Sequence, residues 1–278
     1  MSLGRIVRHL GLYAATVLAC GYALFPVYRI VAMSFMPTLE TFAIPPKWLF
    51  RPTLESYRAL FAGFQGIEVL QYLRNSLLVA FGSTLLTLAI ALLGAYATAR
   101  FRFRGRTFAV AGILVTRMLP PIAMVVPMFL YMYQLGMLDT KTGLIGVYTA
   151  LNIPFAFWMM HGFIKTVPSE MVDAALVDGC TPLSALVRIV LPVVGPGLVA
   201  AAAFSFILAW NDFALAAVLT TSQAKTVPLM ILSFRSPEGV FWGPMAAAAT
   251  LAIAPPVLLM LFLQKWMVRG LTLGATKG

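Results

Sequence analysis

The sequence predicts an all-α polytopic membrane protein with six membrane-spanning helices. Of the 278 residues, 61% are hydrophobic and only 10% are charged, and the mean hydropathy is +0.91. Soluble globular domains carry about 25% charged residues, so this composition excludes a water-soluble fold. The apolar runs are also long enough to cross a bilayer as helices of about 20 residues each.

The apolar runs set the expected boundaries of the six spans. We expect them at about residues 10–33, 75–99, 108–135, 144–164, 193–219 and 244–268. The first run continues well beyond Cys20, which favours an uncleaved span over a short signal peptide. Proline pairs at Pro120-Pro121 and Pro255-Pro256 remove backbone donors, so we expect bends in the third and sixth spans.

The basic residues predict that both termini lie in the cytoplasm. The formal net charge is +11. Basic residues are nearly balanced between the two sides, with Arg5 and Arg8 before the first span. The deciding feature is the short loop after the second span, because short basic loops remain cytoplasmic. It contains Arg100, Arg102, Arg104 and Arg106.

Some functions are excluded by what the sequence lacks. A nucleic-acid partner is not expected, because the basic residues do not gather on a folded polar surface. The phosphate-binding pattern Gly-x-x-x-x-Gly-Lys-Ser/Thr does not occur, and Gly270–Lys277 has its glycines and lysine at the wrong spacing. We therefore expect no catalytic residues, no metal site and no cofactor bound by this chain.

The polar segment 168–192 predicts one short helix, a break and a second short helix. Pro168 suits a first helical position, Gly179 suits a left-handed cap, and Thr181 can cap the second helix. Asp178 places a negative charge near the negative end of the helix dipole, which costs about 0.3–1 kcal/mol. The stability of the helix therefore does not explain why an aspartate stands there. Three interpretations remain open: docking to a partner protein, an exposed solvated loop, or a helix pair lying on the bilayer.

Polar residues inside the spans are candidates for a solute path. Such groups usually face the interior of a helix bundle. Sugars are bound by planar hydrogen-bonding groups and aromatic faces, which adds a tryptophan to the set. The candidates are Arg117, Asn152, Trp210, Asn211 and Asp212. For Arg117 and Asp212, structural pairing or a position at a span end is the alternative. We expect His161 at the membrane interface.

The segment 168–192 also resembles the EAA loop of binding-protein-dependent ABC importer permeases. The matching residues are Asp173-Ala174-Ala175, Gly179, and Ile189, Leu191 and Pro192. Asp173 stands where the family pattern has Glu, so the charge is kept with a shorter reach. Other segments resemble the carbohydrate-uptake group of the maltose-transporter type, which has six spans. They are Asn75-Ser76, Ala95-Tyr96-Ala97, Arg100-Phe101, Phe103-Arg104-Gly105, Arg117–Pro121, Trp210–Phe213, Gln264, and Gly270–Gly278.

The resemblance implies a type I ABC importer permease fold, forming one transmembrane domain over residues 1–278. It implies a location in a bacterial or archaeal cell (inner) membrane and a sugar, polyol or related carbohydrate as solute. The residues of the implied ATPase-coupling helix are Glu170, Asp173, Ala174, Ala175, Asp178 and Gly179.

The implied partners are a second permease subunit, two ATPase subunits, an extracytoplasmic solute-binding protein and membrane lipid. ATP and Mg are then bound by the partner ATPase. The segment 220–243 is expected to reach the binding protein, and the tail 274–278 the ATPase. A stand-alone channel or secondary transporter is the alternative. Broken helices in matched halves would favour that alternative, and the sequence shows no internal repeat.

Overall fold

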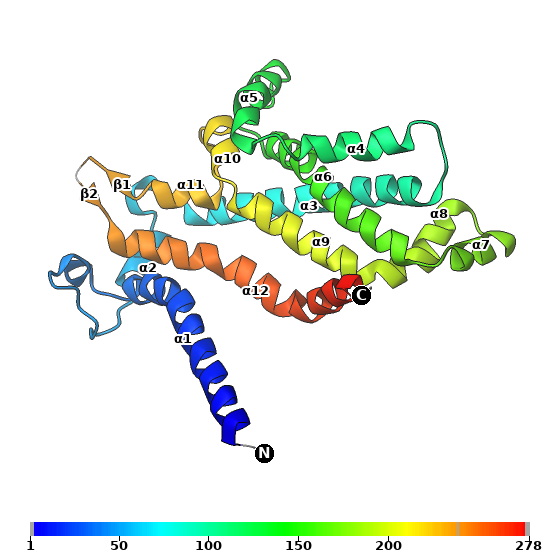
Figure 1. Cartoon of the computed structure of the whole chain (residues 1–278). Coiled ribbons are helices and arrows are strands. Elements are labelled where there is room, and N and C mark those ends of the chain that lie inside the picture. The colour runs from blue at the N-terminus through cyan, green and yellow to red at the C-terminus, as the bar shows by residue number, and fades with distance from the viewer. Residues whose placement is uncertain (1–2, 238, 276–278) are drawn as a thin grey trace. The chain divides into compact units, whose positions relative to one another are not determined.

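The computed structural model describes the backbone of residues 3–237 and 239–275, and the side chains of residues 9–237 and 239–265. The described residues are mainly helical, with one antiparallel pair formed by β1 (Arg235–Ser236) and β2 (Gly239–Val240) (Figure 1). The side chains of Arg5, Arg8 and the tail 274–278 lie outside the described residues. The chain divides into two compact units, residues 1–70 with 230–254 and residues 71–229 with 255–278.

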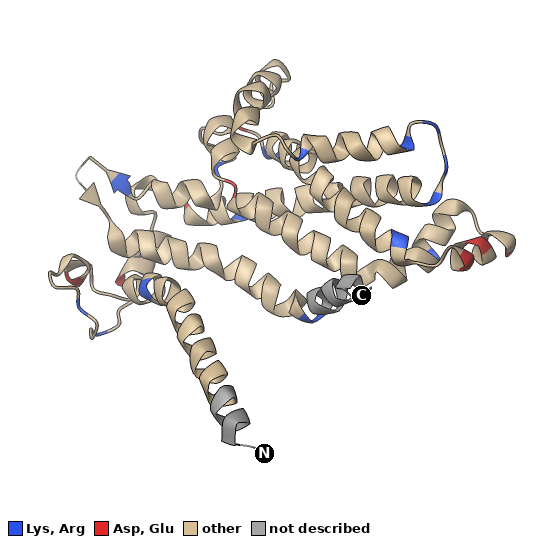
Figure 2. Cartoon of the chain, in the orientation of Figure 1, with Lys and Arg blue, Asp and Glu red and all other residues tan. Residues whose placement is uncertain are grey.

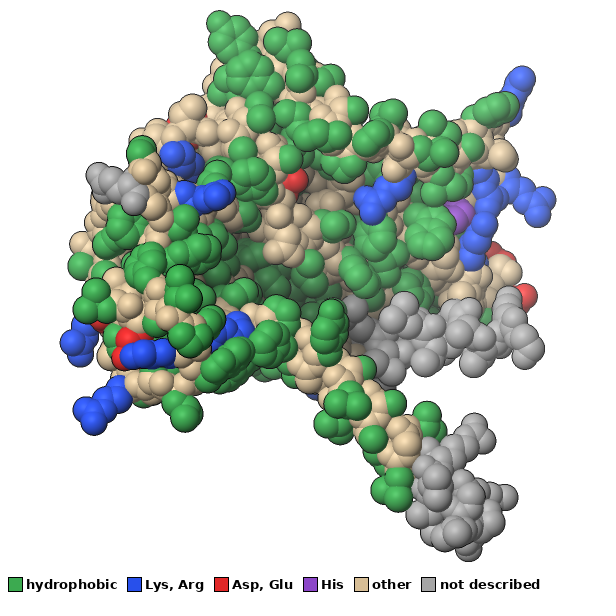
Figure 3. All heavy atoms as spheres, turned by 60° about the vertical axis from the view of Figure 1, so that its left-hand side comes forward, with side chains coloured by type: hydrophobic (Ala, Val, Ile, Leu, Met, Phe, Trp, Pro, Cys, Tyr) green, Lys and Arg blue, Asp and Glu red, His purple; other side chains and the backbone are tan. Residues whose placement is uncertain are grey.

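The first unit begins with α1 (Leu3–Ser34), whose side chains are exposed from residue 9 to residue 28. Hydrophobic side chains run along the described part of this helix (Figure 3), as expected of a helix in contact with lipid. At its end, the Ser34 hydroxyl is hydrogen-bonded to the Tyr57 hydroxyl at 2.8 Å. The other elements include the strands β1 and β2, η1 (Thr38–Phe42), α2 (Glu55–Phe61), η2 (Phe64–Gly66) and the beginning of α12 (Trp242–Ala275).

Most of the remaining helices belong to the second unit. Their bounds are α3 (Val69–Arg100), α4 (Arg106–Thr116), η3 (Pro121–Met124), α5 (Val125–Gln134), α6 (Lys141–Thr166), α7 (Ser169–Val177), α8 (Pro182–Ala185), η4 (Leu186–Val190), α9 (Leu191–Asn211), α10 (Ala214–Leu219) and α11 (Val227–Leu232).

The core of the second unit lies where α6 packs against α9. Small residues permit this packing, as is usual for helices in lipid. A Cβ atom at Gly197 would overlap the Phe163 ring. Ala156, Met160 and Ala201 are fully buried in the same cluster. The two helices therefore approach closely enough to form one scaffold for the residues at their ends.

Five described helices are long and apolar enough to cross a membrane. They are His9–Ser34, Phe64–Arg100, Lys141–Thr166, Pro182–Asn211 and Trp242–Lys265. The third predicted span instead consists of two helical segments, Arg106–Thr116 and Pro121–Gln134, which meet at 95°. The bend predicted at Pro120-Pro121 is thus confirmed, and counting the bent pair as one span gives six. By contrast, α12 continues as one helix through Pro255-Pro256.

Two expected boundaries in the fifth span are wrong. The helix ends at Asn211 rather than near residue 219. The Asp212 carboxylate accepts hydrogen bonds from the N–H groups at the start of α10 and so begins a new helix.

The second helix that the sequence predicts within residues 168–192 is not separate from the fifth span. Helix continues from Pro182 to Asn211. It passes Pro192 through η4, a π-helical turn in which the Leu191 N–H bonds to the Leu186 carbonyl oxygen.

A carboxylate clasp fixes the connection that follows α10. Asp139 accepts hydrogen bonds of 3.0–3.1 Å from four consecutive N–H groups, those of residues 221–224, and its own N–H donates to the Leu219 carbonyl oxygen. Partial burial raises the pKa of this carboxyl, but the four N–H groups outweigh that effect and hold its pKa well below the usual value. From α3, the Asn75 amide donates to the carbonyl oxygens of Gln223 and Lys225 at 2.8 and 3.0 Å. The Asp139 clasp therefore stays charged at neutral pH.

Candidate functional site

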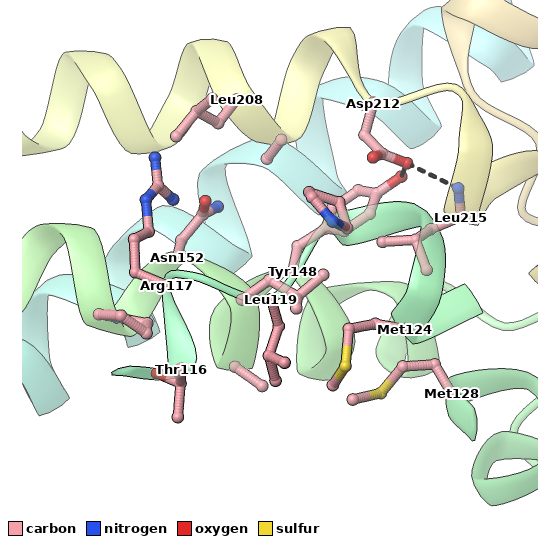
Figure 4. A pocket seen from close by; sticks show the side chains of 15 residues that line it. Thr116, Arg117, Leu119, Met124, Met128, Tyr148, Asn152, Leu208, Asp212 and Leu215 are labelled. Carbon is pink, nitrogen blue, oxygen red and sulfur yellow. Dashed lines mark hydrogen bonds between the residues drawn. The ribbon is translucent and has the colours of Figure 1, made fainter. Parts of the chain in front are cut away.

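The second unit contains a cavity of about 520 Å³. Its walls are the end of α4, the bend at Pro120-Pro121, α5, the middle of α6, the end of α9 and the start of α10 (Figure 4). The lining is mainly apolar, with polar side chains at two places. The lining residues are Thr116, Arg117, Leu119, Pro121, Met124, Met128, Tyr148, Ala150, Leu151, Asn152, Pro154, Leu208, Ala209, Asp212 and Leu215.

Arg117 and Asn152 lie together on one side of this cavity (Figure 4). Arg117 follows the last residue of α4, and its guanidinium carbon lies 5.2 Å from the centre of the Phe155 ring. Asn152 is buried on α6, and its amide nitrogen lies 3.4 Å from the Ser205 carbonyl oxygen. The bend after α4 is what brings the arginine beside α6. This side of the cavity therefore offers several hydrogen-bond donors and one positive charge.

Tyr148 and Asp212 form the other polar part of the cavity, nearer Leu215 (Figure 4). The Tyr148 hydroxyl donates to Asp212 Oδ1 at 3.1 Å, and the Leu215 N–H donates to the same oxygen at 3.1 Å. Asp212 lies in the break between α9 and α10, and this break turns the carboxylate toward α6. The carboxylate is thereby fixed.

Two of the five candidate path residues do not line this cavity. Trp210 is 2% exposed and stacks on Phe206, with ring centres 5.6 Å apart. Asn211, by contrast, is exposed. The structure thus brings Arg117, Asn152 and Asp212 together and places the other two elsewhere, while the role of all five in a solute path stays a prediction.

Sequence reasoning did not select Tyr148, Met124 or Met128, which also face the cavity. The methionines have no local signal, because they join the site only through the bend after α4. The tyrosine carries a hydroxyl in an apolar span, and that signal would have justified including it. His161 was expected at the membrane interface, and its depth in the membrane stays a prediction. Its side chain is 8% exposed, and Nδ1 lies 3.1 Å from the Thr98 hydroxyl.

A second candidate site is the α7 corner, residues 168–182. Gly179 has φ +88° and ends α7 in a left-handed conformation, as the sequence predicts. Its N–H donates to the Leu176 carbonyl oxygen at 3.1 Å, and the Cys180 N–H donates to that of Ala175 at 2.9 Å. This pair of bonds is a Schellman motif. Thr181 then caps α8 by accepting a hydrogen bond from the Ser184 N–H at 3.2 Å.

The α7 corner is attached to the ends of α3 and α6. The Tyr96 hydroxyl donates to the Pro182 carbonyl oxygen at 3.1 Å. The Arg100 guanidinium donates to the carbonyl oxygens of Ile164 and Val167, at 3.0 and 2.6 Å, where α6 ends. The tyrosine bond ties the corner directly to α3, and the two arginine bonds fix α3 to the end of α6, directly before the corner.

The outer face of α7 is acidic and exposed, as Figure 2 shows for its Asp and Glu residues. Val172 and Ala175 are the buried residues of this helix. The exposed residues include Glu170, Asp173, Ala174, Asp178 and Gly179. Because α7 buries one side and exposes its acidic side, it presents a surface that a basic partner would fit.

Comparison with known proteins identifies the family. Residues 90–273 match the family described as "Binding-protein-dependent transport system inner membrane component". The chain is 40% identical to a probable ABC transporter permease protein, y4oR, of Sinorhizobium fredii, over 91% of this chain and 90% of that one. It is 35% identical to the diacetylchitobiose uptake system permease protein DasC of Streptomyces coelicolor, over 91% and 92% of the two chains.

The fold also matches a solved structure. A chain of a bacterial ABC transporter involved in the import of the acidic polysaccharide alginate superposes with a TM-score of 0.75 and 21% identity, covering 95% of this chain and 98% of that one. The type I ABC importer permease fold is therefore confirmed. These findings favour the importer permease over a stand-alone channel or secondary transporter. The chain belongs to the family of binding-protein-dependent transport system inner membrane components.

Proposed function

We propose that this permease subunit carries a carbohydrate through the cavity lined by Arg117, Asn152, Tyr148 and Asp212. The observation that carries the proposal is the pattern of the lining, with donors on one side, a fixed carboxylate on the other and apolar walls between. A molecule with many hydroxyl groups and apolar ring faces suits such a lining. The name of the relative DasC, a diacetylchitobiose uptake permease, supports this class of solute.

The α7 corner is the proposed docking site for a separate ATPase subunit, which binds ATP and Mg. Its support is the exposed acidic face of α7 together with the rigid Schellman motif at Gly179. The proposed complex contains a second permease subunit, two ATPase subunits and an extracytoplasmic solute-binding protein. In this arrangement the ATPase changes its own shape, the corner transmits that motion, and this chain itself hydrolyses nothing.

The proposed orientation puts both termini and the α7 corner in the cytoplasm. Arg100 supports this, because the basic loop that follows this residue lies at the same end of the second unit as the α7 corner (Figure 2). The segment 220–243 then faces the opposite side, where a solute-binding protein would deliver the solute. Part of that segment is held by the Asp139 clasp, so it offers a rigid surface.

Uptake measurements test the solute path. In cells that make the complete transporter, Arg117→Gln should lower the uptake of labelled oligosaccharides about tenfold, because a hydrogen bond to a charged group contributes about 1.5–3 kcal/mol. Arg74→Gln, at an exposed arginine away from the cavity, is the matched control and should leave uptake unchanged. Normal uptake in Arg117→Gln at a normal membrane level would rule out its place in the path. Uptake without ATP would favour a stand-alone channel.

Co-purification tests the docking site separately. Asp173→Arg reverses the charge of the exposed face of α7 and should abolish recovery of the ATPase with the tagged permease. Glu68→Arg makes the same change at an exposed glutamate just before α3 and should have no effect. Full ATPase recovery with Asp173→Arg would refute docking at α7.

A further inference from the structure

We propose that the basic loop, residues 101–108, binds the phosphate-bearing headgroup of an anionic phospholipid. It comprises the turn after α3 and the first residues of α4, and it contains Arg102, Arg104 and Arg106 (Figure 2). The inference concerns the membrane around the protein and does not depend on the proposed solute or on ATPase coupling.

The basic loop forms a concave site rather than an extended basic segment. A hollow of about 260 Å³ is lined by residues on both sides of Gly105. Gly105 has φ +87°, and this tight turn brings Arg102 and Arg106 to the same hollow although they are four residues apart. The two guanidinium groups can therefore approach one bound phosphate group from two sides.

These arginines have no acidic partner in the part of the chain that the structure describes. The ion pair found there joins Lys47 to Glu40. Arg100 differs from its neighbours, because its guanidinium is engaged by the carbonyl oxygens at the end of α6. Arg102 and Arg104 are exposed, and Arg106 is partly exposed. Their charges are therefore available to an external anion.

Exposed aromatic rings beside the arginines favour a lipid over a soluble anion. Phe103 is 46% exposed, Phe108 is 85% exposed, and both line the hollow. In water such exposed rings are unfavourable, but at a bilayer surface they enter the apolar layer while arginines reach the headgroups. The loop also lies where two apolar helical segments end, which is the expected depth of the headgroups. Rings and charges therefore fit the two parts of one lipid molecule.

Native mass spectrometry of the purified full chain tests the site, with phosphatidylglycerol and phosphatidylcholine as probes. The wild type should retain phosphatidylglycerol preferentially, and the double variant Arg102→Gln with Arg106→Gln should weaken that retention about tenfold. The matched control is Arg51→Gln with Arg58→Gln, which removes two exposed arginines elsewhere and should change nothing. Equal loss in both double variants would show a net-charge effect and overturn the proposal.

Two further arms separate lipid from other anions and binding from misfolding. Arg102→Lys with Arg106→Lys keeps the charges and should retain the lipid, whereas loss of binding would overturn the role of charge. Phe108→Ser should weaken phosphatidylglycerol retention several-fold, and an unchanged value would contradict the lipid-tail contact.

Glycerol 3-phosphate at millimolar concentration should not displace the lipid. Full displacement would indicate a free-phosphate site, and equally tight binding of polyglutamate would indicate an acidic protein partner.

Discussion

At the scale of one residue, the Asp139 carboxylate supplies the hydrogen-bond acceptors that a helix or strand would otherwise supply. Its backbone adopts φ +55°, and its carboxylate gathers the N–H groups of residues 221–224, which no helix or strand would otherwise satisfy. Residues 221–223 are exposed, so water could also bond these groups, and it is the single charged acceptor that holds the segment in one conformation. The sequence did not point to Asp139, because its partners lie more than eighty residues away.

Replacing Asp139 by Asn should release this segment. The amide keeps the shape but loses the charge and one acceptor atom, so the N–H groups of residues 221–224 should exchange with deuterium about tenfold faster. Asp173→Asn, at an exposed carboxylate on α7, is the control and should leave their exchange unchanged. Unaltered exchange in Asp139→Asn would mean that Asn75 alone holds the segment.

The Asp139 clasp also predicts a pH dependence. Its pKa is lower in the folded protein than in the unfolded chain, so its stabilisation is fully present above about pH 4 and decreases as pH falls toward the folded value. Exchange at residues 221–224, corrected for intrinsic rates, should therefore be constant from pH 7 to about pH 4 and rise only in stronger acid. A rise near neutral pH would contradict this assignment.

At the scale of the element, the sequence predicted what is local and failed where distant contacts decide. The caps at Gly179 and Thr181 depend on a few adjacent residues, and both form as expected. The end of α9 at Asn211 depends on the Asp212 carboxylate turning toward Tyr148 of α6, which no local pattern reveals. The cavity is a further step away, because it requires the bent pair α4 and α5 to meet α6 and α10.

Gly179 should tolerate no side chain without cost. A Cβ atom there has nothing within 4 Å, so the penalty of Gly179→Ala comes from the left-handed backbone alone and is about 1–2 kcal/mol. For a chain of this size, the Tm in detergent should fall by about 2–4 °C per kcal/mol. Gly162→Ala, in an open helical position, should be neutral or stabilising. Equal shifts in both variants would argue against strain at Gly179.

Gly197 tests the packing of α6 on α9 rather than the backbone. In Gly197→Ala the new methyl group would overlap the Phe163 ring, so we expect a loss of about 1–3 kcal/mol and a lower Tm. Gly195→Ala lies two residues earlier in the same helix, with nothing within 4 Å of the added atom, and should not lower the Tm. A stable Gly197→Ala protein would show that the two helices can separate at little cost.

At the scale of the whole molecule, composition predicted the class and the apolar runs predicted six spans. The third span differs in shape from the other five, because it bends by 95° at Pro120-Pro121. The side of the membrane on which each loop lies is a property of the whole molecule, and in the sequence only the pattern of charges predicts it. The proposed orientation follows from the basic loop after α3.

Cysteine labelling checks this orientation. In a cysteine-free background, Val177→Cys on the outer face of α7 should react with a membrane-impermeant maleimide only after the cells are opened, since Val177 is 86% exposed. Arg51→Cys, at an exposed position before α2, should react in intact cells. Reversed labelling of this pair would invert the proposed topology and place α7 outside the reach of a cytoplasmic ATPase.

The unbroken helix from Pro182 to Asn211 has a mechanical consequence. Its 30 residues span about 45 Å, with the α7 corner at one end and Asp212 directly after the other. A rigid rod of that length acts as a lever: rotating it by about 5° about the corner sweeps its far end through about 4 Å. Because α6 packs along the same rod, such a tilt would carry Tyr148 and Asp212 together. The cavity would then change where the bent pair α4 and α5 faces them.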